Sequence, residues 1–102
     1  MQKGEILPFE NRIVAFTTHD GQIYAGVIAD SFSIRGAIKG PLYEFIQMSC
    51  LLPWKDAEKK KDTVTMRRLE SKVDIRNIKG ISFITWRWYR QNEHLIKLSQ
   101  RK

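Results

Sequence analysis

The chain has 102 residues, of which 42% are hydrophobic and 11% aromatic, a composition typical of one small folded domain and not of a disordered segment. Its formal net charge of +7 is unevenly distributed. Residues 1–54 contain 4 Lys and Arg against 5 Asp and Glu, whereas residues 55–102 contain 14 against 6, a net charge of +8. A basic half of this kind indicates a polyanionic partner such as nucleic acid.

The single cysteine, Cys50, excludes a disulfide within the chain, and its apolar neighbours predict a buried thiol. The first residues hold no apolar run long enough for a secretion signal. No stretch approaches the roughly 20 apolar residues that are needed to cross a bilayer. We therefore expect a soluble, cytoplasmic protein that does not contact membranes.

The clearest pattern lies in residues 12–30, RIVAFTTHDGQIYAGVIAD. Residues alternate with a period of two on both sides of Asp20-Gly21, which is typical of two strands joined by a tight turn. The Asp-Gly pair supplies the positive φ angles that such a turn requires. Gly26 lies inside the second run, where a glycine indicates a bulge or a sharp bend. We predict a bent β-hairpin here.

The middle of the chain alternates between turn-forming and apolar segments. Residues 30–44, DSFSIRGAIKGPLYE, contain two glycines and a proline, which predict a loop that projects from the body of the protein. Residues 43–52, YEFIQMSCLL, predict a third strand, although a helix is an alternative for this run. Three consecutive lysines then predict a basic surface loop near residues 53–63.

The second half continues with short β-type segments. Residues 63–70, TVTMRRLE, resume a strand pattern. Residues 72–86, KVDIRNIKGISFITW, predict two short strands joined by one tight turn at residues 77–80. The isoleucines around this turn are expected to point into the core.

The apolar residues near the C-terminus are spaced partly as in a strand and partly as in a helix. Trp86 and Trp88 alternate as in a strand, which would put both tryptophans on one face. Apolar residues that recur at seven residues predict a tail or helix near residues 89–102. Five or six short strands with tight turns and one terminal helix predict a mainly β fold, a small and strongly bent five- or six-stranded barrel formed by residues 1–102 as a single domain.

Two stretches of the chain resemble the Sm-like group of small five-stranded barrels. Gly26 and Asp30 follow the Asp20-Gly21 turn in the order found in the first hairpin of that group. Residues 75–77, Ile-Arg-Asn, precede spaced isoleucines and are similar to the later apolar-Arg-Gly segment of the group, with asparagine in place of glycine.

This resemblance covers residues 12–30 and 73–85 and implies RNA binding in rings of six or seven subunits. Ser33-Ile34 stand where the Sm-like group carries a base-contacting pair of the Met-Asn type, so base recognition by that loop does not carry over. A Src-homology-like barrel would show a similar hairpin without an RNA role.

Catalytic and metal-binding signatures are missing from the sequence. His19 and His94 have no His, Cys or carboxylate partner at the spacing of a metal site. Cys50 has no base beside it in the sequence, and no glycine-rich phosphate loop is present. We predict a protein that is not an enzyme and that needs no metal or cofactor.

The candidate binding residues are cations of the second half together with one tryptophan. Arginine and lysine neutralise phosphates, and an exposed aromatic ring stacks on unpaired bases. A tryptophan on an alternating strand is more often part of the core, whereas an arginine is rarely buried without a partner. The predicted contacts to RNA or single-stranded DNA are Arg67, Arg68, Arg76, Lys79, Arg87, Trp88 and Arg90.

Two other functions stay open at this point. A protein-interaction or assembly module would dock a partner through strand edges or an exposed aromatic patch. A barrel that binds a small anionic ligand such as a nucleotide would have a deep pocket, lined by Trp54, Tyr43 or Tyr24 and one or two arginines. Clustering of the arginines on one surface would favour nucleic acid. Open strand edges and the Sm-like resemblance also predict a homo-oligomer.

Overall fold

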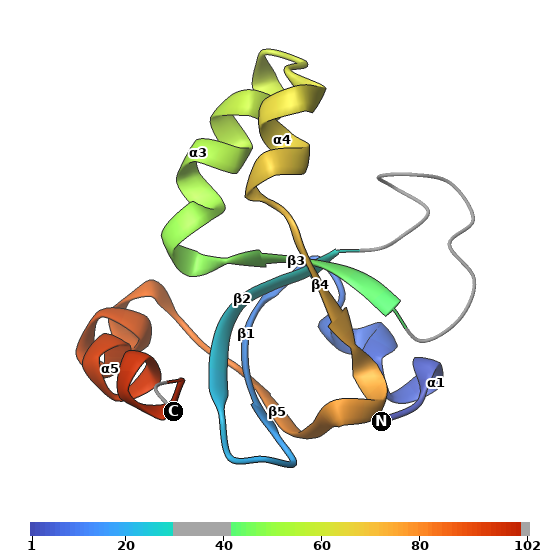
Figure 1. The fold of residues 1–102 in the computed structure, drawn as a ribbon, viewed down its shortest axis with the longest axis vertical. Helices are drawn as coiled ribbons and strands as arrows, with labels where there is room; N and C mark the ends of the chain where they lie inside the picture. Colours follow the sequence, from blue (N-terminus) through green and yellow to red (C-terminus); the bar gives the residue numbers. More distant parts are fainter. Residues whose placement is uncertain (30–41, 101–102) are drawn as a thin grey trace.

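The computed structural model describes residues 1–29 and 42–100 of the chain. Five antiparallel strands form one open sheet in the order β4-β3-β2-β1-β5, and about 49% of the described residues are helical (Figure 1). The elements, including two 3-10 helices (η), are α1 (Lys3–Ile6), η1 (Leu7–Phe9), β1 (Ile13–Thr18), β2 (Ile23–Ala29), β3 (Leu42–Gln47), α3 (Met48–Lys59), α4 (Thr63–Leu69), β4 (Ser71–Asp74), η2 (Ile75–Asn77), β5 (Ile78–Phe83) and α5 (Trp86–Ser99).

The predicted hairpin is confirmed, but its turn is longer than predicted, because residues 19–22 separate the two strands and Gly21 has a positive φ whereas Asp20 does not. β1 and β2 pair antiparallel, with Ile13 opposite Val27 and Thr17 opposite Ile23. Gly21 has a φ of 86°, a left-handed conformation that glycine adopts without the steric cost of a Cβ. The turn is closed by the backbone N–H of Thr18, which donates to the carbonyl of Gln22 at 2.9 Å.

Gly26 lies at a close approach of β2 and β3. A Cβ at this position would lie 2.1 Å from the carbonyl oxygen of Ile46 and 2.9 Å from the Phe45 ring. Only glycine therefore fits between the two strands. The sheet curls strongly on either side of this contact, which gives it an inner and an outer face (Figure 1).

Each face of the sheet has its own core, because successive side chains of a strand point to opposite sides. The inner face buries Val14, Phe16, Ile28, Tyr43 and Phe45, together with residues of α1, η2 and β5. The outer face packs under α3 and α5, and its buried residues are Ala15, Ala25, Ala29, Ile46, Met48, Leu51, Trp54 and Ile96. The thiol of Cys50 packs at the margin of this outer core and is half-buried, so the prediction of a buried thiol is wrong.

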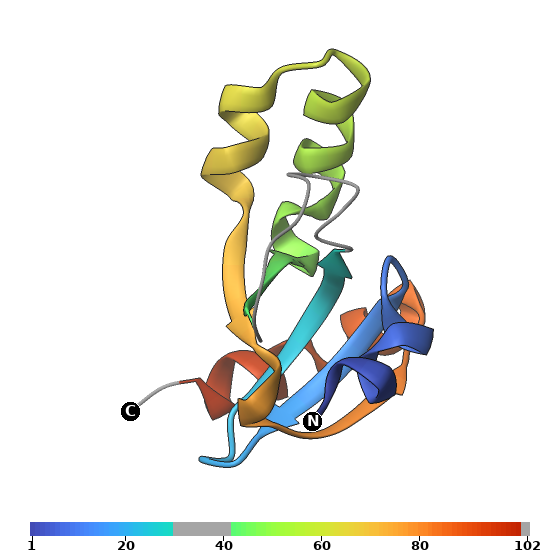
Figure 2. The same cartoon turned by 90° about the vertical axis from the view of Figure 1, so that its right-hand side faces the viewer.

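The prediction of a barrel is wrong. The sheet is open, because β5 pairs with β1 and β4 pairs with β3, while the structure shows no pairing between β4 and β5 in the described residues. The fold is α/β rather than mainly β, because helices replace several of the predicted strands and loops. The strands do form a bent sheet, but the helices α3 and α5 cover its outer face (Figures 1 and 2).

The largest error concerns residues 48–69, where the structure has two helices that form an arm projecting from the sheet (Figure 2). The predicted strand over residues 43–52 ends at Gln47, and the predicted basic loop lies mostly within α3. Residues at a spacing of three along α3 are buried, which is a helical period. The side chain of Asp62 then accepts the backbone N–H of Thr65 and begins α4, where a strand was predicted.

The elements near the C-terminus also differ from the prediction. The two short strands predicted within residues 72–86 are present as β4 and β5, but they are joined by η2 at residues 75–77, earlier than the predicted turn. The terminal helix begins at Trp86, where the side chain of Thr85 accepts the backbone N–H of Trp88 at 3.1 Å. The helix separates the two tryptophans by roughly 200° around its axis, so they do not share a face. Trp86 is half-buried, and Trp88 is 36% exposed.

One predicted segment is described only in part by the structure. The predicted projecting loop over residues 30–44 lies mostly outside the described residues, and the chain is described again from Leu42, where β3 begins. No helix in the described ranges has the length and apolar character that crossing a membrane requires.

Candidate functional site

The predicted nucleic-acid contacts are distributed over three separate parts of the molecule. Two arginines occupy the last turn of α4 on the projecting arm, a second group lies at η2 and β5, and a third lies on α5 over the outer face of the sheet (Figures 1 and 2). The structure therefore does not gather these cations on one surface. In chain order the three groups are Arg67 and Arg68; Arg76 and Lys79; and Arg87, Trp88 and Arg90.

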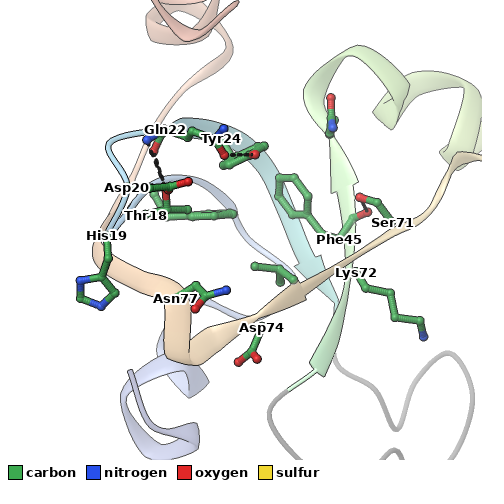
Figure 3. A pocket seen from close by; sticks show the side chains of 13 residues that line it. Thr18, His19, Asp20, Gln22, Tyr24, Phe45, Ser71, Lys72, Asp74 and Asn77 are labelled. Atoms are coloured by element: carbon green, nitrogen blue, oxygen red, sulfur yellow. Dashed lines mark hydrogen bonds between the residues drawn. The ribbon is translucent and has the colours of Figure 1, made fainter. Parts of the chain in front are cut away.

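A hollow lies on the inner face of the sheet. It is a cavity of about 520 Å³ between the end of the β1–β2 hairpin and the strands β3 and β4 (Figure 3). This volume lies within the range of roughly 300–1,000 Å³ that is typical of small-molecule sites. The cavity has an aromatic wall and a polar rim, and we take it as the candidate site.

The aromatic wall consists of Phe16, Tyr24 and Phe45, one residue each from β1, β2 and β3. Phe16 and Tyr24 are stacked with ring centroids 5.4 Å apart, and Phe45 meets both rings edge to face, at 5.2 Å and 6.3 Å. Phe16 and Phe45 are 2% and 3% exposed, whereas Tyr24 is half-buried. Tyr24 is therefore the ring with the most surface available to a ligand.

Hydrogen bonds fix the hairpin side of the cavity. The Tyr24 hydroxyl donates to Oε1 of Gln22 at 2.6 Å, and the backbone N–H of Gln22 donates to Oγ1 of Thr18 at 3.1 Å. The Thr18 hydroxyl in turn donates to the carboxylate of Asp20. This network holds the Tyr24 ring in one orientation, so the aromatic wall is preformed.

Two side-chain amides at the rim are available to a ligand. Within the described residues and their contacts, the amides of Gln47 and Asn77 have no hydrogen-bond partner. The Asn77 backbone is fixed, because its carbonyl accepts the backbone N–H of His19 at 3.2 Å. Figure 3 shows the Asn77 side chain within the lining, across from Phe45, whereas the His19 ring extends away from the cavity. Each amide offers both a donor and an acceptor group.

Charged groups at the rim are held in pairs. The Nζ of Lys72 lies 2.8 Å from Oε1 of Glu44, a carboxylate that is 2% exposed. The guanidinium of Arg76 binds the carboxylate of Asp74 through Nε and Nη2, the latter at 2.8 Å. Side-chain and backbone hydrogen bonds from Arg76 hold the pKa of Asp74 below its usual value. Asp74 is therefore ionised at neutral pH, and the Nη1 edge of Arg76 takes no part in this pair.

The cavity differs from the pocket that the sequence predicted for a small anionic ligand. Tyr24 lines it, as that alternative requires, but Tyr43 and Trp54 are buried elsewhere, in the inner and outer cores. No arginine is among the described lining residues, and two carboxylates, Asp20 and Asp74, stand at the rim. The arrangement suits a neutral ring with hydrogen-bonding edges better than a free anion.

Sequence reasoning missed most of this site. The sequence placed Phe16, Phe45 and Gln47 only within predicted strands and Asn77 only in a predicted turn. One signal was present at Asn77, which stands where the Sm-like segment has glycine. That signal does not indicate that the amides of Gln47 and Asn77 meet at one cavity, because β3 and η2 are separated by the arm in the sequence.

Among the described residues, no group of three or more His, Cys, Asp or Glu side chains is arranged to hold a metal ion. The chain matches no protein-family model, no curated protein and no solved structure. The resemblance to the Sm-like group thus stays a prediction from the sequence.

Proposed function

We propose that this protein binds single-stranded nucleic acid, RNA or single-stranded DNA, by taking one unpaired base into the inner-face cavity. The observation that carries the proposal is the meeting of an aromatic wall with two available amides, those of Gln47 and Asn77, in a cavity of about 520 Å³. Unpaired bases are recognised in this way, by stacking on aromatic rings and by hydrogen bonds to their edges. A base within a duplex stays stacked and paired, so it could not enter the cavity with its Watson–Crick edge free for the amides.

The charge around the cavity supports the same proposal. Lys72 lines the rim, and Arg76 and Lys79 lie on either side of the rim segment that carries Asn77. All three are exposed, with the side chain of Lys72 at 55% and that of Arg76 at 72%. A phosphate next to the bound base would be neutralised by these cations.

The proposal narrows the set of contacts that the sequence predicted. Arg76 and Lys79 remain in it, and Lys72, Gln47 and Asn77 are added. Arg87, Trp88 and Arg90 lie on α5, across the sheet from the cavity, and Arg67 and Arg68 belong to the arm. A non-enzymatic binding module that works in the cytoplasm remains part of the proposal, and cell fractionation tests that location.

A salt titration tests the electrostatic part. Each phosphate contact contributes roughly −0.7 to the slope of log affinity against log salt for single strands, so three cations predict a slope of about −2. We expect the double variant Arg76→Ala/Lys79→Ala to flatten this slope by about one unit or more. The matched control is Arg87→Ala/Arg90→Ala, which removes the same number of charges from α5 and should leave the slope unchanged.

The probe is a fluorescently labelled single-stranded RNA of mixed sequence, compared with the DNA strand of the same sequence and with the corresponding duplex. We expect both single strands to bind more tightly than the duplex. Equal flattening of the slope by the two double variants would point to diffuse attraction by the net charge. No binding of either single strand at low salt would refute the proposed function.

A further inference from the structure

The outer face of the sheet carries a second hollow, an apolar groove of about 290 Å³ between β5 and α5. Its floor is made of small residues, Thr17, Gly80 and Ser82, on neighbouring strands. Trp88 and Leu95 of α5 form its wall and are 36% and 54% exposed. Ile23 of β2 also lines the groove, but the positions of β1 and β5 at Thr17, Gly80 and Ser82 carry no large side chain to meet Trp88 and Leu95.

The groove exists because α5 packs on the centre of the sheet and not on its edge. Ile96 is buried in the outer core, and Trp86 and Tyr89 pack against that core from the same helix. The Ser99 hydroxyl accepts the backbone N–H of Ile23 at 2.9 Å, which ties the end of α5 to β2. Trp88 and Leu95 lie on the side of the helix that is turned toward β5. They have no strand beneath them beyond β5, because β5 is the last strand of the sheet.

The edge of β5 is suited to pair with one more strand. In the described residues, β5 pairs with β1 alone, and the register shifts at Lys79, so that Gly80 to Phe83 form the regular part of this edge. A strand added here would lie about 4.8 Å from β5, with alternate side chains pointing to the outer face. Those side chains would lie next to Gly80 and Ser82 and would fill the groove below Trp88 and Leu95.

Positive charge surrounds this edge. Lys79 stands at the beginning of its regular part, and at its other end the Arg12 guanidinium lies 5.1 Å from the centre of the Phe83 ring. Lys79 and Arg87, the latter in the first turn of α5 next to Trp88, are exposed and have no carboxylate partner within the described part of the chain. Two copies of this edge would bring like charges together, whereas an acidic segment would neutralise them.

We propose that the β5 edge and its groove bind an extended acidic segment of another protein, which adds a strand to the sheet and places alternate apolar side chains against Trp88 and Leu95. Backbone hydrogen bonds to β5 provide affinity, and the groove and flanking cations select the sequence of the segment. This surface lies on the face opposite the inner cavity and shares Lys79 with the proposed phosphate contacts, but the groove and the strand edge are not part of the cavity, so the inference does not depend on the proposed nucleic-acid function.

The test uses the full chain and two synthetic eight-residue peptides, one alternating valine with glutamate and the other alternating valine with lysine. We expect the glutamate peptide alone to shift the NMR signals of the Gly80–Phe83 amides and to slow their hydrogen exchange. Leu95→Glu puts a carboxylate into the groove and should weaken this binding by at least about tenfold. Leu98→Glu is the matched control, because Leu98 is 50% exposed on the same helix and does not line the groove. It should change the affinity by less than about twofold.

Four results would overturn the inference. The first is the absence of any change at Gly80–Phe83 with the glutamate peptide. The second is equal binding of the two peptides, and the third is an equal loss of affinity in the two leucine variants. The fourth is a dimer in sedimentation that Leu95→Glu dissociates and Leu98→Glu does not, because a second copy would then occupy the edge. Circular dichroism of both variants checks that the fold is retained.

Discussion

The inner cavity and the outer groove lie on opposite faces of one sheet and share strand β1, yet they differ in chemistry. β1 turns Phe16 inward, where it joins the aromatic wall of the cavity, and turns Ala15 and Thr17 outward, where they lie under the groove. Curvature explains the difference. The inner face converges and brings long side chains from three strands into contact, whereas the outer face diverges and leaves space above small ones. One alternating strand thus contributes to two surfaces of different chemistry.

The first and largest effect concerns the bend that separates these two surfaces. Gly26→Val would force a Cβ to within 2.1 Å of the Ile46 carbonyl, so β2 and β3 could not keep their spacing. We expect this variant to lose more than about 3 kcal/mol of unfolding free energy, and with it both binding activities. Urea unfolding measures the loss. Gly4→Ala is the control, since no atom lies within 4 Å of a Cβ there, and a stable Gly26→Val variant would contradict the packing of the two strands.

The second prediction separates the two surfaces directly. Asn77→Ala removes one amide from the cavity and should weaken binding of single-stranded RNA by roughly tenfold, while binding of the glutamate peptide is unchanged. Leu95→Glu should do the reverse, with RNA affinity unchanged. Fluorescence anisotropy with each ligand measures all four affinities. If either variant lowered the affinities for RNA and for the peptide equally, the two surfaces would not be independent.

The contrast between residues 12–29 and residues 48–69 explains how far the sequence predicted the fold. The hairpin was predicted correctly because its signals are local: strand alternation, an Asp-Gly turn, and a glycine required by a close contact. The arm was predicted wrongly because local signals disagree with the packing. Pro53 and the lysine run indicate a loop, but Trp54 and Ala57 are buried at helical spacing. Packing of α3 against α4 and against the outer face of the sheet decides the structure there, and this packing is not visible in the local sequence pattern.

The candidate site was predicted less well than the fold. Arg76 and Lys79 were expected as phosphate contacts and flank the cavity residue Asn77 in the sequence, but the other predicted contacts lie on α4 and α5. The residues of such a site are brought together by contacts between segments that lie far apart in the sequence. Gln47 and Asn77 come to one rim only because β3 pairs with β4, whose end continues into η2. The homo-oligomer expected from open strand edges stays a prediction, and the sedimentation experiment at the β5 edge tests it.

The third prediction tests the hairpin turn and has an intermediate effect. Gly21 has a φ of 86° but open space around it, so a larger side chain there meets strain without a steric clash. We expect Gly21→Val to cost about 1 kcal/mol of unfolding free energy, well below the cost of Gly26→Val. Because the turn carries Asp20 and Gln22 at the cavity rim, RNA binding should weaken slightly, whereas peptide binding should not. A larger loss than that of Gly26→Val would reverse the roles assigned to the two glycines.

The smallest effect is expected from the Asp74–Arg76 pair at the cavity rim. Because hydrogen bonds from Arg76 lower the pKa of Asp74 in the folded state, the pair contributes stability above the ordinary aspartate pKa of about 3.9 and loses it as the pH falls through the lowered value. At neutral pH the carboxylate therefore competes with phosphate for Arg76. Asp74→Asn removes the charge and keeps an oxygen that can accept the Arg76 backbone N–H. We expect it to raise RNA affinity by about twofold and to leave peptide affinity unchanged. The gain should vanish when Arg76→Ala is added, and a gain that persisted would mean that Asp74 repels the phosphate directly, without acting through Arg76.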